Sequence, residues 1–275
     1  MNTNVVKNFS KVKPIAFLIP IGILLLLWIY LYLNDGLSQE GYIRVQKDWF
    51  LKLNGWLSQF PDFQNNATQM GDALVFLSIL SVFVILTPRV WEALISGSLV
   101  SLVLSAVLKK IFSVPRPAAA LGEEHCVIIG KILKGHNSLP SGHSITAFTI
   151  IMVLLYAFMP SQRWLRWLWC VGMLVLGVVF VSSRVGVGAH YPLDTLVGAC
   201  VGFISALSGI YICMKSRFLR WIEQKRFYPL FIIAFSGGLL ALINKMTQEH
   251  LLIYYIAGVG LLVALYKMIL NYVKK

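Results

Sequence analysis

The sequence predicts an all-α protein, a polytopic bundle of transmembrane helices. Of its 275 residues 58% are apolar and only 13% are charged, and the mean hydropathy is +0.75. A soluble domain is nearer to half apolar and a quarter charged. Several apolar runs are long enough to cross a bilayer. The length suits one compact bundle rather than several separate domains.

Eight apolar runs are predicted to span the membrane. The first follows Lys7, Lys11 and Lys13 and has no small-residue cleavage site after it, which indicates an uncleaved helix rather than a signal peptide. The second and fourth runs are short, and we expect them to extend into their flanking loops. The predicted spans are Ile15–Leu33, Ala73–Leu86, Trp91–Ile111, Ser144–Phe158, Leu165–Val181, Leu193–Met214, Pro229–Ile243 and Leu251–Tyr272.

The segment near 43–60, between the first two spans, is predicted to form an amphipathic helix in the outer interface. Polar residues, Asn54 among them, fall between apolar ones at helical spacing, and tryptophans are favoured at headgroup level. This helix either guides a membrane ligand sideways into a site or only anchors the fold. Its apolar residues are Ile43, Trp49, Phe50, Leu53, Trp56, Leu57 and Phe60.

Basic residues predict the orientation of the bundle. With the N-terminus in the cytoplasm, more than half of the 24 basic residues lie on the cytoplasmic side, as the positive-inside rule requires. Both termini are then cytoplasmic, and we expect the cytoplasmic (inner) membrane. The same rule explains the net charge of +13, so no nucleic-acid partner is expected. No cysteine pair has CxxC spacing, which argues against a zinc site and a disulfide framework.

Three polar segments fall at the outer face under this orientation. The first ends the third predicted span, the second begins the fourth, and the third joins the fifth to the sixth. They are Lys109 with Arg116-Pro117, then Pro140-Ser141-Gly142-His143, then Ser183-Arg184 with His190 and Asp194. Their convergence on one face predicts a single site.

The residue types in these segments suit a phosphate group. Lys109, Arg116 and Arg184 supply positive charge and, from the two arginines, forked donors. Ser141 and Gly142 stand where a helix begins, and backbone N–H groups at a helix N-terminus bind anions. Together the five residues predict a phosphate-binding cradle.

The remaining residues suit phosphoryl transfer. Pro192 fits the first turn of a helix, which places Asp194 where the helix dipole favours a carboxylate and within reach of His190. A histidine oriented in this way can act as a nucleophile, and His143 can protonate a leaving oxygen. The segments hold no acidic cluster for Mg²⁺, so we expect a metal-independent reaction through a phosphohistidine, with no cofactor.

The three segments resemble the signature of the type 2 phosphatidic acid phosphatase (PAP2) superfamily of membrane lipid phosphatases. That signature is K-x6-RP, PSGH and SR-x5-H-x3-D, and every position matches here. The resemblance implies that His190 attacks phosphorus, that Asp194 orients it and that His143 protonates the leaving group. It also implies a six-helix core over 1–214. Residues 215–275 then form a basic cytoplasmic link and two additional spans.

The resemblance implies a hydrolase acting on a lipid phosphomonoester or diphosphate at the outer face of the membrane. Phosphatidate, phosphatidylglycerophosphate, undecaprenyl diphosphate and lipid A phosphate all fit the pattern, and membrane lipids are the expected partners. One alternative is a phosphotransferase that passes the phosphoryl group to another lipid. A second is a non-enzymatic lipid-binding or transport protein. The loop Ala118–Gly135 either selects the headgroup or only connects two motifs.

Overall fold

The computed structural model describes residues 1–273, and across them the chain is helical, with no β-strand. This confirms the predicted all-α bundle. Six helical stretches are long and apolar enough to cross a membrane, which makes the protein a multi-pass membrane protein. They are Pro14–Leu33, Pro88–Ala120, Arg163–Gly186, Pro192–Lys215, Lys225–Gln248 and Leu252–Val273.

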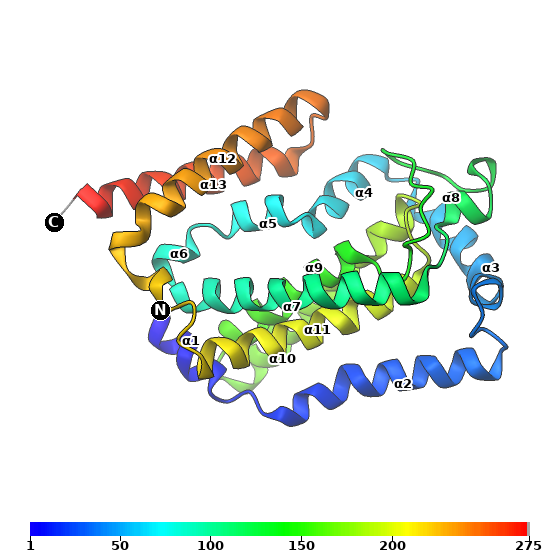
Figure 1. Cartoon of the computed structure of the whole chain (residues 1–275), viewed down its shortest axis with the longest axis horizontal. Coiled ribbons are helices and arrows are strands. Elements are labelled where there is room, and N and C mark those ends of the chain that lie inside the picture. The colour runs from blue at the N-terminus through cyan, green and yellow to red at the C-terminus, as the bar shows by residue number, and fades with distance from the viewer. Residues whose placement is uncertain (274–275) are drawn as a thin grey trace.

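Four helices form the centre of the bundle (Figure 1). Helix α11 packs closely on α9 and α7, and glycines allow this approach. A Cβ placed on Gly198 would lie 2.7 Å from the carbonyl oxygen of Ser141, and one on Gly209 would lie 2.5 Å from the backbone of Gly97. The four are α7 (Pro88–Phe112), α9 (Gly142–Ala157), α10 (Arg163–Gly186) and α11 (Pro192–Lys215).

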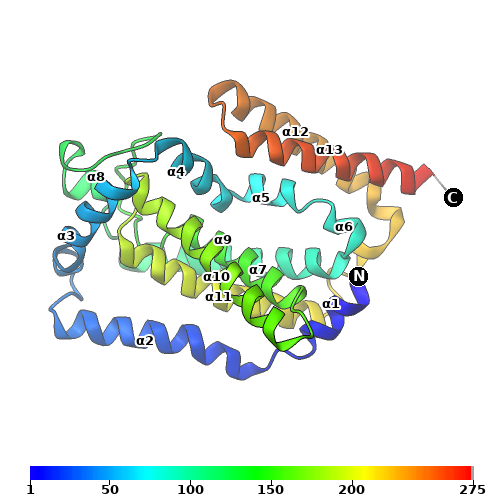
Figure 2. The same cartoon turned by 180° about the vertical axis from the view of Figure 1, so that it is seen from behind.

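Two further layers flank this centre. Helix α2 (Leu18–Leu33) runs along one side, and the hairpin of α12 (Tyr228–Gln248) and α13 (Leu252–Val273) runs along the opposite side (Figures 1 and 2). The start of the chain and the end of α13 lie at the same end of the bundle, as both views show. That end also carries α1 (Asn2–Phe9) and the short helix η1 (Pro14–Phe17).

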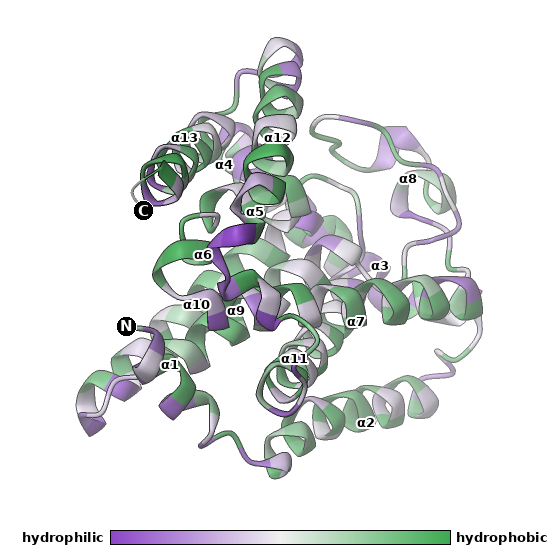
Figure 3. Cartoon of the chain, turned by 60° about the vertical axis from the view of Figure 1, so that its left-hand side comes forward, coloured by the Kyte–Doolittle hydropathy of each residue, from purple (hydrophilic) through white to green (hydrophobic). Residues whose placement is uncertain are grey.

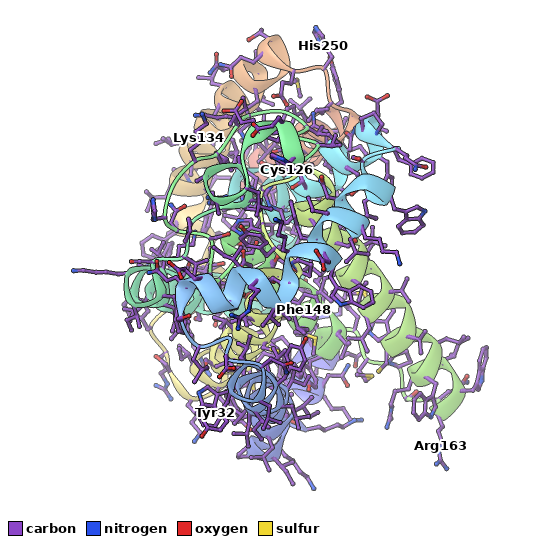
Figure 4. The ribbon with its side chains drawn as sticks, turned by 90° about the vertical axis from the view of Figure 1, so that its right-hand side faces the viewer. Tyr32, Cys126, Lys134, Phe148, Arg163 and His250 are labelled. Carbon is purple, nitrogen blue, oxygen red and sulfur yellow. The ribbon has the colours of Figure 1, made fainter. Side chains whose placement is uncertain are left out.

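The other end of the bundle is covered by short helices and loops. Figure 3 shows hydrophobic ribbon along the long helices and hydrophilic segments mainly toward their ends and in loops. Figure 4 looks onto this end, with Cys126 and Lys134 on one side of α3 and Tyr32 on the other. The covering elements are α3 (Gln39–Leu57), α4 (Pro61–Thr68), η2 (Gln69–Gly71), α8 (Pro117–Ala120) and η3 (Glu123–His125).

The second predicted span is broken, and it does not extend into its flanking loops as expected. The chain forms α5 (Ala73–Ile79) and then α6 (Phe83–Leu86), with a turn between them. The Ser81 hydroxyl donates to the carbonyl oxygens of Ser78 (2.7 Å) and of Gly260 in α13 (3.1 Å). A serine hydroxyl that bonds backbone carbonyls in this way competes with regular helix hydrogen bonding. The fourth span, α9, also stays short: it begins at Gly142 and ends at Ala157.

The amphipathic segment forms helix α3, but its buried face differs from the predicted apolar pattern. The residues that face the protein are Tyr42, Gln46, Phe50 and Asn54, spaced four apart. Asn54 was expected on the polar face, yet it is buried because its side chain bonds backbone groups, as described below. Trp49 and Trp56 are exposed, as an interfacial helix requires.

Ion pairs fix the parts that flank the central helices. Lys245 of α12 pairs with Asp72, the residue that caps α5, at 2.9 Å. At the end that carries the termini, Arg89 pairs with Glu92 (2.8 Å) and with Glu223 (3.1 Å). Glu223 ends the short helix η4 (Arg220–Glu223), which is followed by η5 (Lys225–Phe227). These contacts hold the α12–α13 hairpin and the basic link against α5 and α7.

Candidate active site

The three polar segments meet at the covered end of the bundle. Lys109 lies in the last turn of α7 and Arg184 in the last turn of α10. Arg116 follows α7, and Gly142 and His143 begin α9. The chain then turns through Gly188, whose φ of 73° lies in the left-handed region that glycine adopts readily. This turn lets the backbone N–H of His190 donate to the carbonyl oxygen of Arg184 at 3.2 Å. The sequence-predicted residues are therefore brought together.

His190 and Asp194 form the predicted pair. Helix α11 begins at Pro192, which places Asp194 in its first turn. The Nδ1 atom of His190 lies 3.5 Å from Oδ2 of Asp194, and both side chains are buried. A carboxylate beside Nδ1 favours the tautomer with a proton on Nδ1, which leaves the lone pair of Nε2 free.

Asp194 is held by three further donors. The Tyr42 hydroxyl donates to Oδ1 at 2.8 Å, and the backbone N–H of Tyr191 donates to Oδ2 at 3.0 Å. The Ser138 hydroxyl donates to Oδ2 as well. Burial and the nearby Asp194 charge raise the pKa of Tyr42, so its phenol remains protonated and able to donate. A carboxylate with this many donors has a fixed orientation.

Arg116 contacts the other nitrogen of His190. Its Nη1 lies 3.2 Å from His190 Nε2 and 3.1 Å from the carbonyl oxygen of Ala189. Its Nε donates to Oδ1 of Asn137 at 2.8 Å, which fixes the plane of the guanidinium. With its proton on Nδ1, His190 presents the Nε2 lone pair to Arg116, a cation that attracts the anionic oxygens of a phosphate group.

The remaining cations lie close by. Arg184 is buried, its Nη1 donates to the Thr68 hydroxyl, and its Nε has no partner within the described residues. An unpaired buried donor is costly and therefore points toward a ligand. Lys109 borders the start of α9, because a Cβ placed on Gly142 would lie 3.3 Å from its Nζ. Ser141 caps this helix by accepting from the backbone N–H of Ser144.

His143 stands in the first turn of α9, one residue after Gly142, which borders Lys109. The backbone of η2 passes directly beside it: a Cβ on Gly71 would lie 2.5 Å from the Cβ of His143. The missing side chain at Gly71 thus makes room for His143.

Helix α3 supports the chain segment that carries His190. Gln46 accepts from the backbone N–H of Leu193 at 3.0 Å, and the Phe50 ring packs edge-on against Tyr191. The amide nitrogen of Asn54 lies 2.9 Å from two backbone oxygens, one in α10 and one in the loop that follows α8. Gln46, Phe50 and Asn54 thus each hold one part of this segment or of its neighbours.

The electrostatics of the site favour an anion. Three cations face one carboxylate, which leaves two positive charges in excess. Burial lowers the pKa of His190 well below its usual value, and the charges of Arg116, Arg184 and Lys109 lower it further. The imidazole is therefore neutral near pH 7, which is the nucleophilic form. Within residues 1–273, no group of three or more His, Cys, Asp or Glu side chains is placed to hold a metal ion.

Sequence reasoning missed the residues that support the site. Ser138 lies two residues before Pro140, so its closeness to a motif was a usable signal. Asn137 is adjacent to Ser138 and carried the same signal, whereas Tyr42 and Thr68 gave none, because they lie far from every motif in the sequence.

A comparison with protein families matches residues 89–219 to the PAP2 superfamily. The matched range contains all three polar segments. Over this range, which is just under half of its length, the chain is similar to the PAP2 superfamily. Among solved structures, the crystal structure of Aquifex aeolicus LpxE is similar, with 26% identity and a TM-score of 0.50. The similarity covers 61% of this chain and 95% of that one.

Curated relatives of this chain carry the names of phosphatases and of a permease. The bacitracin transport permease protein BcrC of Bacillus licheniformis is 32% identical over 54% of this chain and 59% of its own. Undecaprenyl-diphosphatase of Sulfolobus acidocaldarius is 26% identical over 64% of this chain and 78% of its own. Phosphatidylglycerophosphatase B of Haemophilus influenzae is 35% identical over 24% of this chain and 29% of its own. The match to the permease thus spans about three fifths of that relative's length.

Proposed function

We propose that this protein is a membrane lipid phosphatase that cleaves a phosphomonoester or diphosphate through a phosphohistidine on His190. The observation that carries the proposal is the placement of His190 between Asp194 at Nδ1 and Arg116 at Nε2. A neutral, oriented imidazole whose lone pair faces cations has what a nucleophile for a phosphate group needs. The names of the phosphatase relatives support the same reaction class.

In the first step, His190 Nε2 attacks phosphorus and the bond to the leaving oxygen breaks. The electron pair of that bond goes to the leaving oxygen, which takes a proton from the imidazolium form of His143, the form that the negative charge of a bound phosphate group favours. Asp194 stabilises the charge on the His190 ring, as the carboxylate of a catalytic triad does for its histidine. Lys109, Arg116 and Arg184 neutralise the oxygens of the transferred group, together with the N–H groups beside Ser141 and Gly142.

In the second step, water attacks phosphorus on the opposite side from His190 Nε2. His143, now neutral, takes a proton from this water, and the bond between phosphorus and nitrogen breaks. Free phosphate leaves and His190 returns to its starting form. The protein cations perform the charge neutralisation in both steps, so we propose that no metal ion is required.

We further propose that the site opens at the outer face of the cytoplasmic membrane and that both termini are cytoplasmic. The support is the distribution of basic residues together with the position of the site at the end of the bundle opposite the start of the chain and the end of α13. In the same proposal, 1–214 is the catalytic core, and 215–275 provides the basic link and two added helices. The Sulfolobus acidocaldarius relative bears the name undecaprenyl-diphosphatase, so a polyprenyl diphosphate is the first substrate to test.

The test is phosphate release by the purified protein in detergent, from a panel of lipid phosphates with and without EDTA. We expect release that persists in EDTA and is lost in His190→Ala. His250→Ala is the matched control, because His250 is exposed between α12 and α13 and contacts Tyr255 of α13. Release that EDTA abolishes would refute the metal-independent mechanism.

The same experiment separates two other functions. A phosphotransferase would move labelled phosphate from a donor lipid to an acceptor lipid with little free phosphate. The name of the Bacillus licheniformis relative favours transport as a second candidate. A transporter would keep its function in His190→Ala, whereas a phosphatase would not.

A further inference from the structure

The segment 66–72 joins α4 to α5 and contacts residues of the site. The Thr68 hydroxyl accepts from Nη1 of Arg184. The backbone at Gly71 packs directly against His143, since a Cβ on Gly71 would lie 2.5 Å from the Cβ of His143 and 2.7 Å from its carbonyl oxygen. The position of this segment therefore affects where both site residues can lie.

The same segment contacts the α12–α13 hairpin at two points. Oδ1 of Asn66 accepts at 3.0 Å from the backbone N–H of Ile253, in the first turn of α13, where a helix leaves its N–H groups without partners of its own. Oδ2 of Asp72 pairs with Nζ of Lys245 in α12 at 2.9 Å, while its Oδ1 accepts from the backbone N–H of Leu74 and caps α5. Each helix of the hairpin thus holds one end of the segment.

The hairpin is itself packed firmly enough to act as a support. Nζ of Lys245 lies 5.5 Å from the centroid of the Tyr254 ring, within the range of a cation–π contact. A Cβ on Gly260 would lie 2.7 Å from the carbonyl oxygen of Ser78, so α13 packs closely on α5 as well. In Figures 1 and 2, α5 accordingly lies between the hairpin and the central helices.

We propose that the α12–α13 hairpin is a positioning element of the active site, and that Lys245 acts through Asp72 and the backbone of Gly71 to hold His143 where it can protonate the leaving oxygen. The inference rests on the proposed phosphatase function, in which His143 is the proton donor. A general acid works only within hydrogen-bond reach of the atom that it protonates. Movement of the segment 66–72 therefore slows the step that needs this proton.

The need for this proton depends on the leaving group, which provides the readout. An alkoxide is a strong base and needs the proton of His143 as its bond to phosphorus breaks, whereas 4-nitrophenolate is weakly basic and leaves with little assistance. The measured quantity is the ratio of kcat/KM for dodecyl phosphate to kcat/KM for 4-nitrophenyl phosphate. A loss of folded protein lowers both values and leaves their ratio unchanged.

The first set of variants tests the ion pair. Lys245→Met removes the cation that pairs with Asp72, and we expect the ratio to fall about twofold to fivefold, in keeping with the modest strength of a partly exposed ion pair. Lys245→Arg can keep the pair and should retain the wild-type ratio. Lys267→Met is the matched control, because Lys267 is exposed on α13 toward the end of that helix remote from Ile253.

The second set tests the backbone contact directly. Gly71→Ala places a methyl group where the Cβ of His143 is only 2.5 Å away, so the segment and the histidine must separate. Because a small displacement of a catalytic group has a large effect on rate, we expect the ratio to fall about tenfold or more. Gly237→Ala on α12 meets nothing within 4 Å and should leave the ratio unchanged.

His143→Ala is the reference variant, and it separates this inference from the function on which it rests. If the wild type hydrolyses neither phosphate, or if His143→Ala leaves the ratio unchanged, the proposed reaction or the proposed role of His143 fails, and the inference fails with it. If His143→Ala lowers the ratio but Lys245→Met and Gly71→Ala do not, the hairpin only stabilises the fold and the inference alone is wrong. A lower ratio in both of these variants, with Lys245→Arg and the two controls like the wild type, supports the inference.

Discussion

Asp194 accepts hydrogen bonds from three different parts of the chain, and at the residue scale this fixes the geometry of His190. Tyr42→Phe keeps the ring and removes one donor. Because the donors from Ser138 and Tyr191 remain, we expect kcat to fall about tenfold rather than to vanish, a loss of about 1.4 kcal/mol. Steady-state kinetics with a single lipid phosphate measures this.

The control for this prediction is Tyr32→Phe, because Tyr32 is exposed on α2. A purely structural role for Tyr42 would lower the melting temperature without altering kcat of the folded protein. That result would show that the hydroxyl does not act through Asp194.

The pKa of His190 determines where kcat/KM decreases on the acid side of its pH profile. Burial and then the charges of Arg116, Arg184 and Lys109 lower its pKa, so protonation that blocks attack occurs only below the usual value of about 6.5. We therefore expect kcat/KM to decrease as the pH falls below that value. Arg116→Gln removes one of these charges and should move the acid limb to higher pH, whatever it does to the maximal rate.

The same shift has a consequence for stability. Since the folded pKa of His190 lies below the unfolded value, the unfolded chain binds more protons between the two values. Its contribution to stability is therefore full above about pH 6.5 and decreases as the pH falls below it. A melting temperature in detergent that rose on acidification from pH 7 to pH 5 would contradict a neutral buried His190 as the dominant group.

At the scale of elements, the contact between α9 and α11 aligns two of the three motifs. The backbone N–H of Ser141 donates to the carbonyl oxygen of Asp194 at 3.1 Å, and Gly198 packs beside the Ser141 carbonyl. Gly198→Ala would separate the helices, so we expect a loss of about 1–3 kcal/mol in stability together with reduced activity. Gly172→Ala on α10 meets nothing within 4 Å and should be neutral or slightly stabilising.

Thermal unfolding in detergent and phosphate release measure both variants. Equal melting temperatures for Gly198→Ala and Gly172→Ala would mean that the helices can separate without cost. In that case the close packing of α9 and α11 would not be what aligns Ser141 with Asp194.

Hydropathy and motif spacing predicted the helical bundle, the similarity to the PAP2 superfamily and the residues that meet in the site, because each signal is local in sequence. The broken span at Ser81 was not predicted, since its break involves the carbonyl of Gly260, which is distant in the chain. Asn54 was placed on the wrong face for the same reason: its buried partners are backbone groups, which leave no trace in side-chain polarity.

At the scale of the whole molecule, the bundle has two chemically different ends. The cationic site, α3 and the loops lie at one end, and the start of the chain and the end of α13 lie at the other (Figures 1 and 2). The α12–α13 hairpin contacts the rest of the bundle through the ion pair between Lys245 and Asp72, the residue that caps α5. Asp72 directly follows Gly71, whose backbone packs against His143. The hairpin thus reaches the backbone that borders the site, although it contributes none of the motif residues.

Because the two ends of the bundle face opposite sides of the membrane in the proposed orientation, cysteines introduced at each end should differ in reactivity in intact cells. His136 is exposed in the loop that precedes the second motif, and Ser10 is exposed beside α1 at the opposite end. With Cys170→Ser as background, because the other three cysteines are buried, His136→Cys should react with a membrane-impermeant thiol reagent from outside. Ser10→Cys should react only after the membrane is opened. The reverse pattern would place the site in the cytoplasm and overturn the proposed orientation, and the background protein without an added cysteine gives the baseline.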